Sequence, residues 1–157
     1  MNSYRTHTCS ELRAANIGKP TTLIGWVDSV RDHGGVIFID LRDRSGITQV
    51  VFHPEVNQDV AKASQQLRSE DMIQISGTVA ARLKTDTVDT TNADLPTGEI
   101  EVSADTLNVI NKADVLPFQL DRALSNEDLR LKYRFLDLRR PSMVRNCLLY
   151  TSDAADE

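Results

Sequence analysis

A chain of 157 residues has the length of one compact domain, or of one domain with an appendage, and is too short for two complete enzymatic domains. Its composition, 40% hydrophobic and 26% charged with a formal net charge of −5, is typical of a globular protein and excludes collagen, wholesale disorder and a membrane bundle. No apolar run approaches the roughly 20 residues of a membrane-spanning helix and no signal peptide is recognisable, so we expect a cytoplasmic protein with no membrane partner. Cys9 and Cys147 lie far apart and form no C-x-x-C pair, which excludes a disulfide framework and a zinc knuckle.

The first third of the chain predicts a short helix followed by three strands. Thr8 and Glu11 have the spacing of a capping box and Gly18 closes the segment, so residues 10–16 are predicted to be a short N-terminal helix. Segments rich in β-branched residues then alternate with turn sequences, as in a meander of three strands. The strands are expected over residues 21–31, 36–42 and 47–52, with turns at 32–35 and 43–46.

The next segment predicts one helix and two further strands. Apolar residues recur at the spacing of an amphipathic helix, at Val56, Val60, Ala63 and Leu67. Alternating patterns return over residues 72–83 and, after a polar loop, over 99–103. Five strands with a helix between the third and fourth predict a mostly β domain over residues 1–112, a Greek-key barrel of the OB-fold type. Other small barrels share this order of strands.

A basic segment follows the predicted barrel. Residues 113–147 are expected to form a linker and hinge, in which residues 127–143 favour a helix until Pro141 interrupts it. The net acidity comes mostly from the middle of the chain, because residues 55–112 carry five Lys/Arg against ten Asp/Glu. Residues 129–147 instead carry six Lys/Arg against the single acid Asp137. Such a run is either a solvated helix face or a surface for RNA or a neighbouring domain.

The second and third strands predict a surface for single-stranded nucleic acid. Ile37, Ile39 and Leu41 form an apolar face, so alternation places Phe38 on the opposite face, toward solvent. The same argument directs Gln49 outward on the third strand. Arg31 ends the first strand beside the turn. An exposed aromatic ring, an amide and an arginine are the groups that stack on a base, pair with its edge and hold phosphate.

Plainer interpretations stand beside this one. An exposed phenylalanine is often ordinary surface or packs under a loop, and an outward glutamine is usually only solvated. Trp26 on its strand is more often a core residue than a binding residue. The three histidines, His7, His33 and His53, lack the spacing of metal ligands. We find no nucleophile with a plausible base, so no catalytic residue is predicted.

Three segments resemble the N-terminal part of bacterial-type aspartyl-tRNA synthetases. They are WVDSVRDHGGVIFIDLRDRSGITQVVF (26–52), LPTGEIEV (95–102) and LRLKYRFLDLRRP (129–141), and the similarity extends from about Tyr4 to Asn146. The asparaginyl and lysyl enzymes share the OB-fold, but RDHGG joined to FIDLRD and TGEIEV looks like the aspartyl branch. The resemblance implies an anticodon-binding OB-fold, a hinge and then a class II catalytic domain that activates aspartate with ATP and Mg²⁺.

The resemblance also implies roles for individual residues. Phe38 matches the phenylalanine that stacks on the central uridine of the anticodon, and Gln49 the glutamine that hydrogen-bonds that base. Arg31 matches a nearby arginine, and Glu101 an acidic residue that reads the first anticodon position. Three arginines are candidates for contacts with the tRNA backbone or the hinge: Arg82, Arg139 and Arg140. The expected partner is aspartate tRNA, with asparagine tRNA as an open alternative.

The sequence departs from the family pattern in three places. Many members carry consecutive arginines at residues 29–31, where this chain has Ser29-Val30-Arg31, and an arginine in place of Ala80, so phosphate contacts there are in doubt. After about Asn146 the family pattern stops, and residues 148–157 are expected to be a non-native tail. On this interpretation the catalytic domain of a homodimeric parent enzyme is missing, and the chain alone is inactive and binds no cofactor.

Two other functions fit the sequence. One is a free-standing OB-fold module that binds single-stranded nucleic acid without an enzymatic parent, although the hinge at 129–141 argues against it. The other is a small barrel that binds oligosaccharides or is purely structural.

Overall fold

The structure, a computed structural model, describes residues 4–83, 89–120 and 126–153. The chain divides into two compact units, Met1–Ala113 and Asp114–Glu157. The predicted boundary after residue 112 lies one residue from this division. Within the described parts of the chain, no helix is long and apolar enough to cross a membrane.

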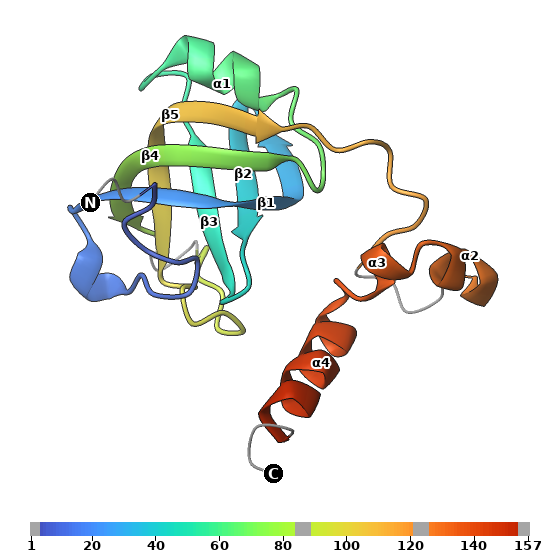
Figure 1. The fold of residues 1–157 in the computed structure, drawn as a ribbon. Coiled ribbons are helices and arrows are strands. Elements are labelled where there is room, and N and C mark those ends of the chain that lie inside the picture. The colour runs from blue at the N-terminus through green and yellow to red at the C-terminus, as the bar shows by residue number, and fades with distance from the viewer. Residues whose placement is uncertain (1–3, 84–88, 121–125, 154–157) are drawn as a thin grey trace. The chain divides into compact units, whose positions relative to one another are not determined.

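The first unit is a closed five-stranded barrel (Figure 1). Its strands are β1 (Pro20–His33), β2 (Val36–Arg42), β3 (Ile47–Phe52), β4 (Met72–Ala81) and β5 (Ile100–Asn111). They follow one another around the barrel in the order β1-β2-β3-β5-β4, and only β3 and β5 pair in parallel. The helix α1 (Gln58–Ser64) connects β3 to β4 and lies over β5 at one end of the barrel (Figure 1). The predicted OB-fold, with a helix between strands 3 and 4, is confirmed.

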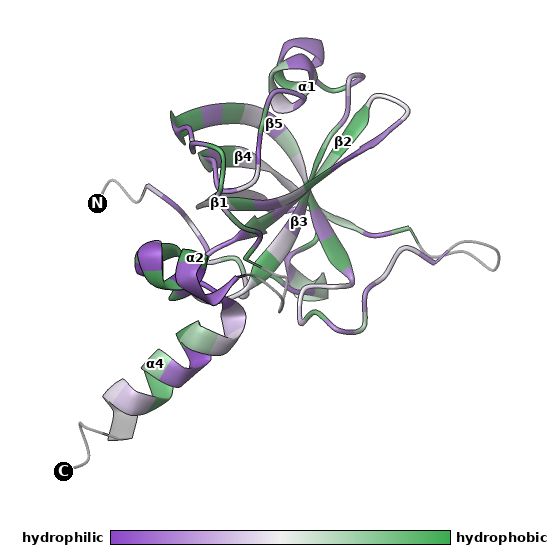
Figure 2. Cartoon of the chain, turned by 90° about the vertical axis from the view of Figure 1, so that its right-hand side faces the viewer, coloured by the Kyte–Doolittle hydropathy of each residue, from purple (hydrophilic) through white to green (hydrophobic). Residues whose placement is uncertain are grey.

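Alternation along the strands builds the core. In β2, Ile37, Ile39 and Leu41 are buried, while Phe38 and Asp40 lie on the outer face. Figure 2 shows the same alternation as green and purple bands along the strands. Because every strand contributes alternate residues to the interior, the opposite set is available for a binding surface. Trp26 belongs to that outer set and is half-buried, so the expectation that it is a core residue was wrong.

The ends of several elements differ from the sequence predictions. The last strand was predicted over 99–103 but continues to Asn111, paired with β4. Residues beyond Ala104 are mostly exposed, so they lack the apolar alternation that identifies a strand. Helix α1 begins only after Asn57, whose side chain accepts hydrogen bonds from the backbone of Asp59 and Val60. Val56 therefore precedes the helix and is exposed, outside the predicted apolar stripe.

The predicted N-terminal helix over 10–16 is reduced to one 3-10 turn, η1 (Ala14–Asn16). Glu11 does accept the backbone N–H of Thr8 at 2.7 Å, so the capping contact forms without the helix. Cys9 and Leu12 are both fully buried in the barrel core. Their burial fixes this segment in an extended, turning path across the barrel, and tertiary packing overrides the local helix signal.

Asp43, in the turn between β2 and β3, is hydrogen-bonded to that N-terminal segment. Its carboxylate accepts the backbone N–H groups of Cys9 (3.0 Å), Ser45 (2.7 Å) and Gly46 (3.2 Å). Burial alone would raise the pKa of Asp43, but the hydrogen bond from the Ser45 hydroxyl, together with these backbone N–H groups, outweighs burial and lowers the pKa below its ordinary value. Burial likewise raises the pKa of the neighbouring Cys9 thiol to about 12.

We expect Asp43→Asn to lower the free energy of unfolding at pH 7 by about 1–3 kcal/mol. Because the folded-state pKa of Asp43 is lowered, its contribution is complete above the unfolded-state pKa and is lost as the pH falls through the folded-state pKa. The difference between wild type and variant should therefore shrink in acid. Urea unfolding at a series of pH values measures it, with Asp94→Asn, an exposed acid, as the control of equal charge. Equal effects of the two substitutions would contradict the role of Asp43.

The second unit is helical. Its helices are α2 (Glu127–Lys132), α3 (Arg134–Asp137) and α4 (Pro141–Asp153). The helix predicted over 127–143 is interrupted at Tyr133, whose backbone angles (φ −108°, ψ 50°) are not helical. Pro141 begins a helix instead of interrupting one, since the first helical position needs no backbone N–H. The non-native tail predicted over residues 148–157 would begin inside α4. Residues 121–125 and 154–157 lie outside the described residues.

Candidate nucleic-acid interface

The pairing of the strands assembles the predicted site residues on one outer face of the barrel. Arg31 of β1 is the partner of Phe38 of β2, and Asp40 of β2 is the partner of Gln49 of β3. The parallel pairing of β3 with β5 then places Gln49 beside Glu101, and their side chains are hydrogen-bonded at 2.9 Å. Residues from four strands, separated by up to 70 positions in the chain, thus form one surface.

A groove of about 700 Å³ runs over this surface. Its lining includes Arg31, Phe38, Gln49 and Arg82, together with residues 90–92 of the loop before β5. Phe38 is half-buried, and its ring meets that of His33 in a T-shaped contact with the centroids 5.5 Å apart. The groove therefore joins an aromatic ring to amide, guanidinium and backbone groups, the combination that holds unpaired bases.

Gln49 is on the predicted face but is not solvated. Only 7% of the residue is exposed, and residues 90–92 of the loop before β5 line the same groove. Its side-chain Nε2 donates to Oε2 of Glu101. Burial raises the pKa of Glu101, while the hydrogen bond from Gln49 and the positive charge of Arg82 act in the opposite direction.

Arg31 is exposed and paired with Asp40, at 2.9 Å. Ser29, which stands where many relatives of this chain were expected to carry an arginine, donates its hydroxyl to the same carboxylate at 2.6 Å. Asp40 thus holds Arg31 at the edge of the groove. An exposed ion pair of this kind contributes little to stability, so Arg31 is available to exchange Asp40 for a phosphate or a base.

Arg82 lies deeper than its predicted role suggested. The residue is 7% exposed, and its guanidinium donates to the carbonyl oxygens of Ile100 (3.0 Å) and Thr90 (3.3 Å). Its Nη2 is buried and has no hydrogen-bond partner among the residues that the structure describes. Burial lowers the pKa of Arg82. A buried donor at the bottom of a groove is suited to a carbonyl acceptor that enters the groove.

Arg139 and Arg140 belong to the second unit and not to the barrel. Arg140 lies 3.3 Å and Arg134 2.5 Å from the carboxylate of Asp137, which is fully buried. Asp137 thus pairs with several arginines of the basic segment 129–147. The structure pairs Arg140 with Asp137 within the second unit, and contact of Arg139 and Arg140 with tRNA stays a prediction.

Sequence reasoning identified Asp40 only as an outward residue and missed the loop at 90–92. The signal for Asp40 was its position two residues after Phe38 on the same face. The loop has no periodic pattern, and its contact with Arg82 is made by a backbone oxygen, that of Thr90, which no side-chain pattern predicts.

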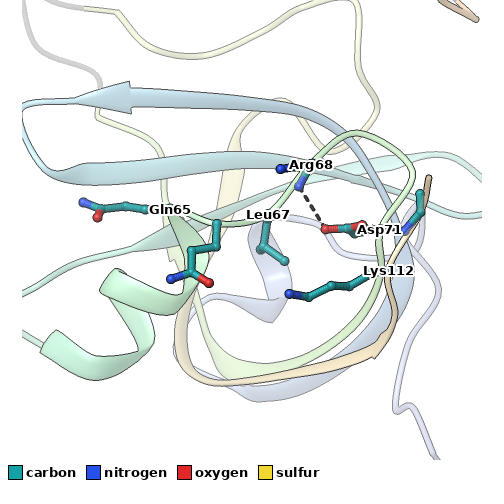
Figure 3. Close-up of a pocket in the computed structure, with 7 residues that line it drawn as sticks. Gln65, Leu67, Arg68, Asp71 and Lys112 are labelled. Atoms are coloured by element: carbon teal, nitrogen blue, oxygen red, sulfur yellow. Dashed lines mark hydrogen bonds between the residues drawn. The ribbon is translucent and has the colours of Figure 1, made fainter. Parts of the chain in front are cut away.

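A second cavity, of about 470 Å³, lies between the segment after α1 and the end of β5 (Figure 3). Arg68 and Lys112 are exposed around it. The one carboxylate in its lining, Asp71, already accepts the backbone N–H groups of Arg68 (2.9 Å) and Ala113 (2.8 Å). Asp71 therefore fixes the path by which the chain leaves the barrel. Among the described residues, no group of three or more His, Cys, Asp or Glu is arranged to hold a metal ion.

Residues 21–110 match the model for the OB-fold nucleic acid binding domain of the tRNA anticodon type, and the chain belongs to this family. Within it, the chain corresponds to the N-terminal, anticodon-binding part of the aspartate–tRNA ligases. It is 51% identical over 148 residues, 94% of the chain, to the aspartate–tRNA(Asp/Asn) ligase of Methylacidiphilum infernorum. It is 54% identical over 146 residues, 92% of the chain, to the ligase of the same name from Desulfotalea psychrophila.

The chain spans about a quarter of the length of these relatives, 24% of the first and 23% of the second. Among solved structures, it resembles the asparaginyl-tRNA synthetase of Pyrococcus horikoshii, with a TM-score of 0.74 and 27% identity. That similarity covers 88% of this chain and 31% of the synthetase.

Proposed function

We propose that the chain recognises the anticodon loop of a tRNA through the groove on the outer face of the barrel. Phe38 stacks on an unpaired base, Gln49 hydrogen-bonds its edge, and Glu101 contacts a neighbouring base. Arg31 and Arg82 supply positive charge and donors at the edge and the bottom of the groove. The observation that carries this proposal is that Phe38 and Gln49, from different strands, line one groove, and that Glu101, distant in sequence, is hydrogen-bonded to Gln49.

The names of the curated relatives support aspartate tRNA as the partner and asparagine tRNA as a second one. We further propose that the chain acts in the cytoplasm, as part of a longer, homodimeric ligase that attaches aspartate to tRNA. ATP and Mg²⁺ would bind to parts of such a ligase that this chain does not contain. By itself the chain is expected to bind tRNA without aminoacylating it.

The proposal is tested by titrating the full chain with a hairpin RNA that carries the aspartate anticodon loop. The matched control is the same hairpin with its central anticodon base changed from uracil to cytosine. Fluorescence anisotropy should show binding about tenfold or more tighter to the first RNA, since one well-placed base contact gives roughly 1–3 kcal/mol. Equal binding of both RNAs would support instead a module for single-stranded nucleic acid. Binding of neither would exclude RNA as the ligand of this groove.

A further inference from the structure

The second cavity, which is lined by residues 65–68, 71, 112 and 113, has two cations in its lining. Arg68 lies in the segment between α1 and β4, Lys112 directly follows β5, and both are exposed. Among the described residues, neither forms an ion pair with an acid. They are two of only five Lys/Arg in residues 55–112, a stretch with ten Asp/Glu. Positive charge is therefore concentrated at this cavity, within an acidic part of the chain.

Asp71 brings the two cations to one place. Its Oδ2 accepts the backbone N–H of Arg68 at 2.9 Å, and its Oδ1 accepts that of Ala113, the residue after Lys112, at 2.8 Å. Asp71 is only 2% exposed, so these bonds are shielded from water and fix the two backbone segments relative to each other. Because both oxygens of the carboxylate meet backbone N–H groups, Asp71 leaves the two cationic side chains for a ligand.

The rest of the lining adds donors around the same space. Gln65 and Gln66 are exposed and carry amide N–H groups, while Leu67 is buried and forms an apolar side of the cavity. Figure 3 shows the side chain of Lys112 extending from the end of β5 toward Leu67. A carboxylate offers two acceptor oxygens, whereas a phosphate group offers three or more and accepts two parallel hydrogen bonds from one arginine. Phosphate thus matches this set of donors better than a carboxylate does.

We propose that the second cavity is a binding site for a phosphate group, held by the guanidinium of Arg68 and the ammonium of Lys112. The amides of Gln65 and Gln66 add hydrogen bonds to its oxygens. This site goes beyond the proposed function, because it shares no lining residue with the groove that carries Phe38. The phosphate belongs either to the backbone of a bound RNA or to a free phosphate compound, and the contact chemistry is the same for both.

The test is an NMR titration of the full chain with inorganic phosphate, in which sodium phosphate replaces sodium chloride at constant ionic strength. The backbone amides of residues 65–68 and 112–113 should shift and reach saturation. Lys112→Gln should weaken phosphate binding about threefold, since an exposed ion pair is a modest contact. Arg68→Gln should weaken it by a larger factor, because two parallel bonds are lost.

Lys62→Gln is the matched control, because Lys62 is exposed on the neighbouring helix α1 but does not line the cavity. It makes the same change in charge as Lys112→Gln and should leave phosphate binding unchanged. A parallel titration with sodium acetate tests whether the site distinguishes phosphate from a carboxylate. The substituted positions are exposed, so thermal unfolding should be the same for all variants.

A second arm identifies the source of the phosphate, with the hairpin RNA that carries the aspartate anticodon loop. If Lys112→Gln lowers the slope of log affinity against log salt by about one and Lys62→Gln does not, the RNA backbone supplies the phosphate. If inorganic phosphate binds while the slope is the same in both variants, a free phosphate compound is the ligand.

Three results would overturn the site: no saturable shift with phosphate, equal shifts with acetate, or equal weakening by Lys112→Gln and Lys62→Gln. The phosphate titration needs no RNA, so its outcome is separate from that of the anticodon groove. If the wild-type chain binds no hairpin, the proposed function fails and the phosphate titration still decides the second site.

Discussion

Replacing Phe38 with alanine should weaken binding of the anticodon hairpin by about tenfold or more. The expectation follows from stacking, since the contact between a base and an aromatic side chain contributes roughly 1–3 kcal/mol. Phe38 lies in the lining of the groove between Arg31 and Gln49, so its ring is the surface on which a base held by those residues would rest. Titration by fluorescence anisotropy at fixed salt measures the loss, because ionic contacts change with salt concentration.

The matched variant is Phe38→Tyr, which retains an aromatic ring and should keep most of the affinity. Since Phe38 is half-buried against His33, thermal unfolding of both variants must be compared with that of the wild type. If folded Phe38→Ala bound the RNA as tightly as Phe38→Tyr, stacking on this face would be excluded, and the groove would need another explanation.

Alternation of apolar and polar residues was sufficient to predict which face of the barrel carries Phe38. It did not predict how deeply Gln49 and Arg82 are buried beside it. Period two is a property of the strand backbone, so the outward direction of Phe38 and Gln49 follows from sequence alone. The side chain of Gln49 is hydrogen-bonded to Glu101, 52 positions away, and shares its groove with a loop that has no periodic pattern. The parallel pairing of β3 with β5, which creates that contact, is a tertiary event that no local pattern encodes.

In the fold too, elements with a clear local pattern were predicted, and elements set by tertiary contacts were not. Strands β2 and β3 begin and end where their patterns do, because β-branched and apolar residues fill them and Gly or Pro lies close to their ends. The second half of β5 was missed, because it is held by hydrogen bonds to β4 while its side chains stay exposed. The helix predicted over 10–16 failed for the opposite reason, since burial of Cys9 and Leu12 fixes the backbone.

Gly77, in β4, should be among the least replaceable residues of the barrel. It faces Thr21 of β1 on one side and Ala104 of β5 on the other, where the register of β4 and β5 shifts by a bulge. A Cβ atom on Gly77 would lie 2.0 Å from the carbonyl oxygen of Ser103 and 2.8 Å from Cα of Ala104. Both are backbone atoms, so no side-chain rotation relieves the clash; the strands themselves would have to separate.

We therefore expect Gly77→Ala to lower the free energy of unfolding by about 3 kcal/mol or more, the upper end of the cost of overpacking. Thr78→Ala is the control, because Thr78 is the next residue on β4 and is exposed; it should change stability by about 0.5 kcal/mol or less. Urea unfolding followed by circular dichroism measures both. Because the β4–β5 ladder supports Glu101 on the groove side, Gly77→Ala should also reduce RNA binding, in proportion to the fraction unfolded. Equal midpoints for the two variants would show that β4 and β5 do not approach as closely as described, and the placement of Glu101 beside Gln49 would lose its support.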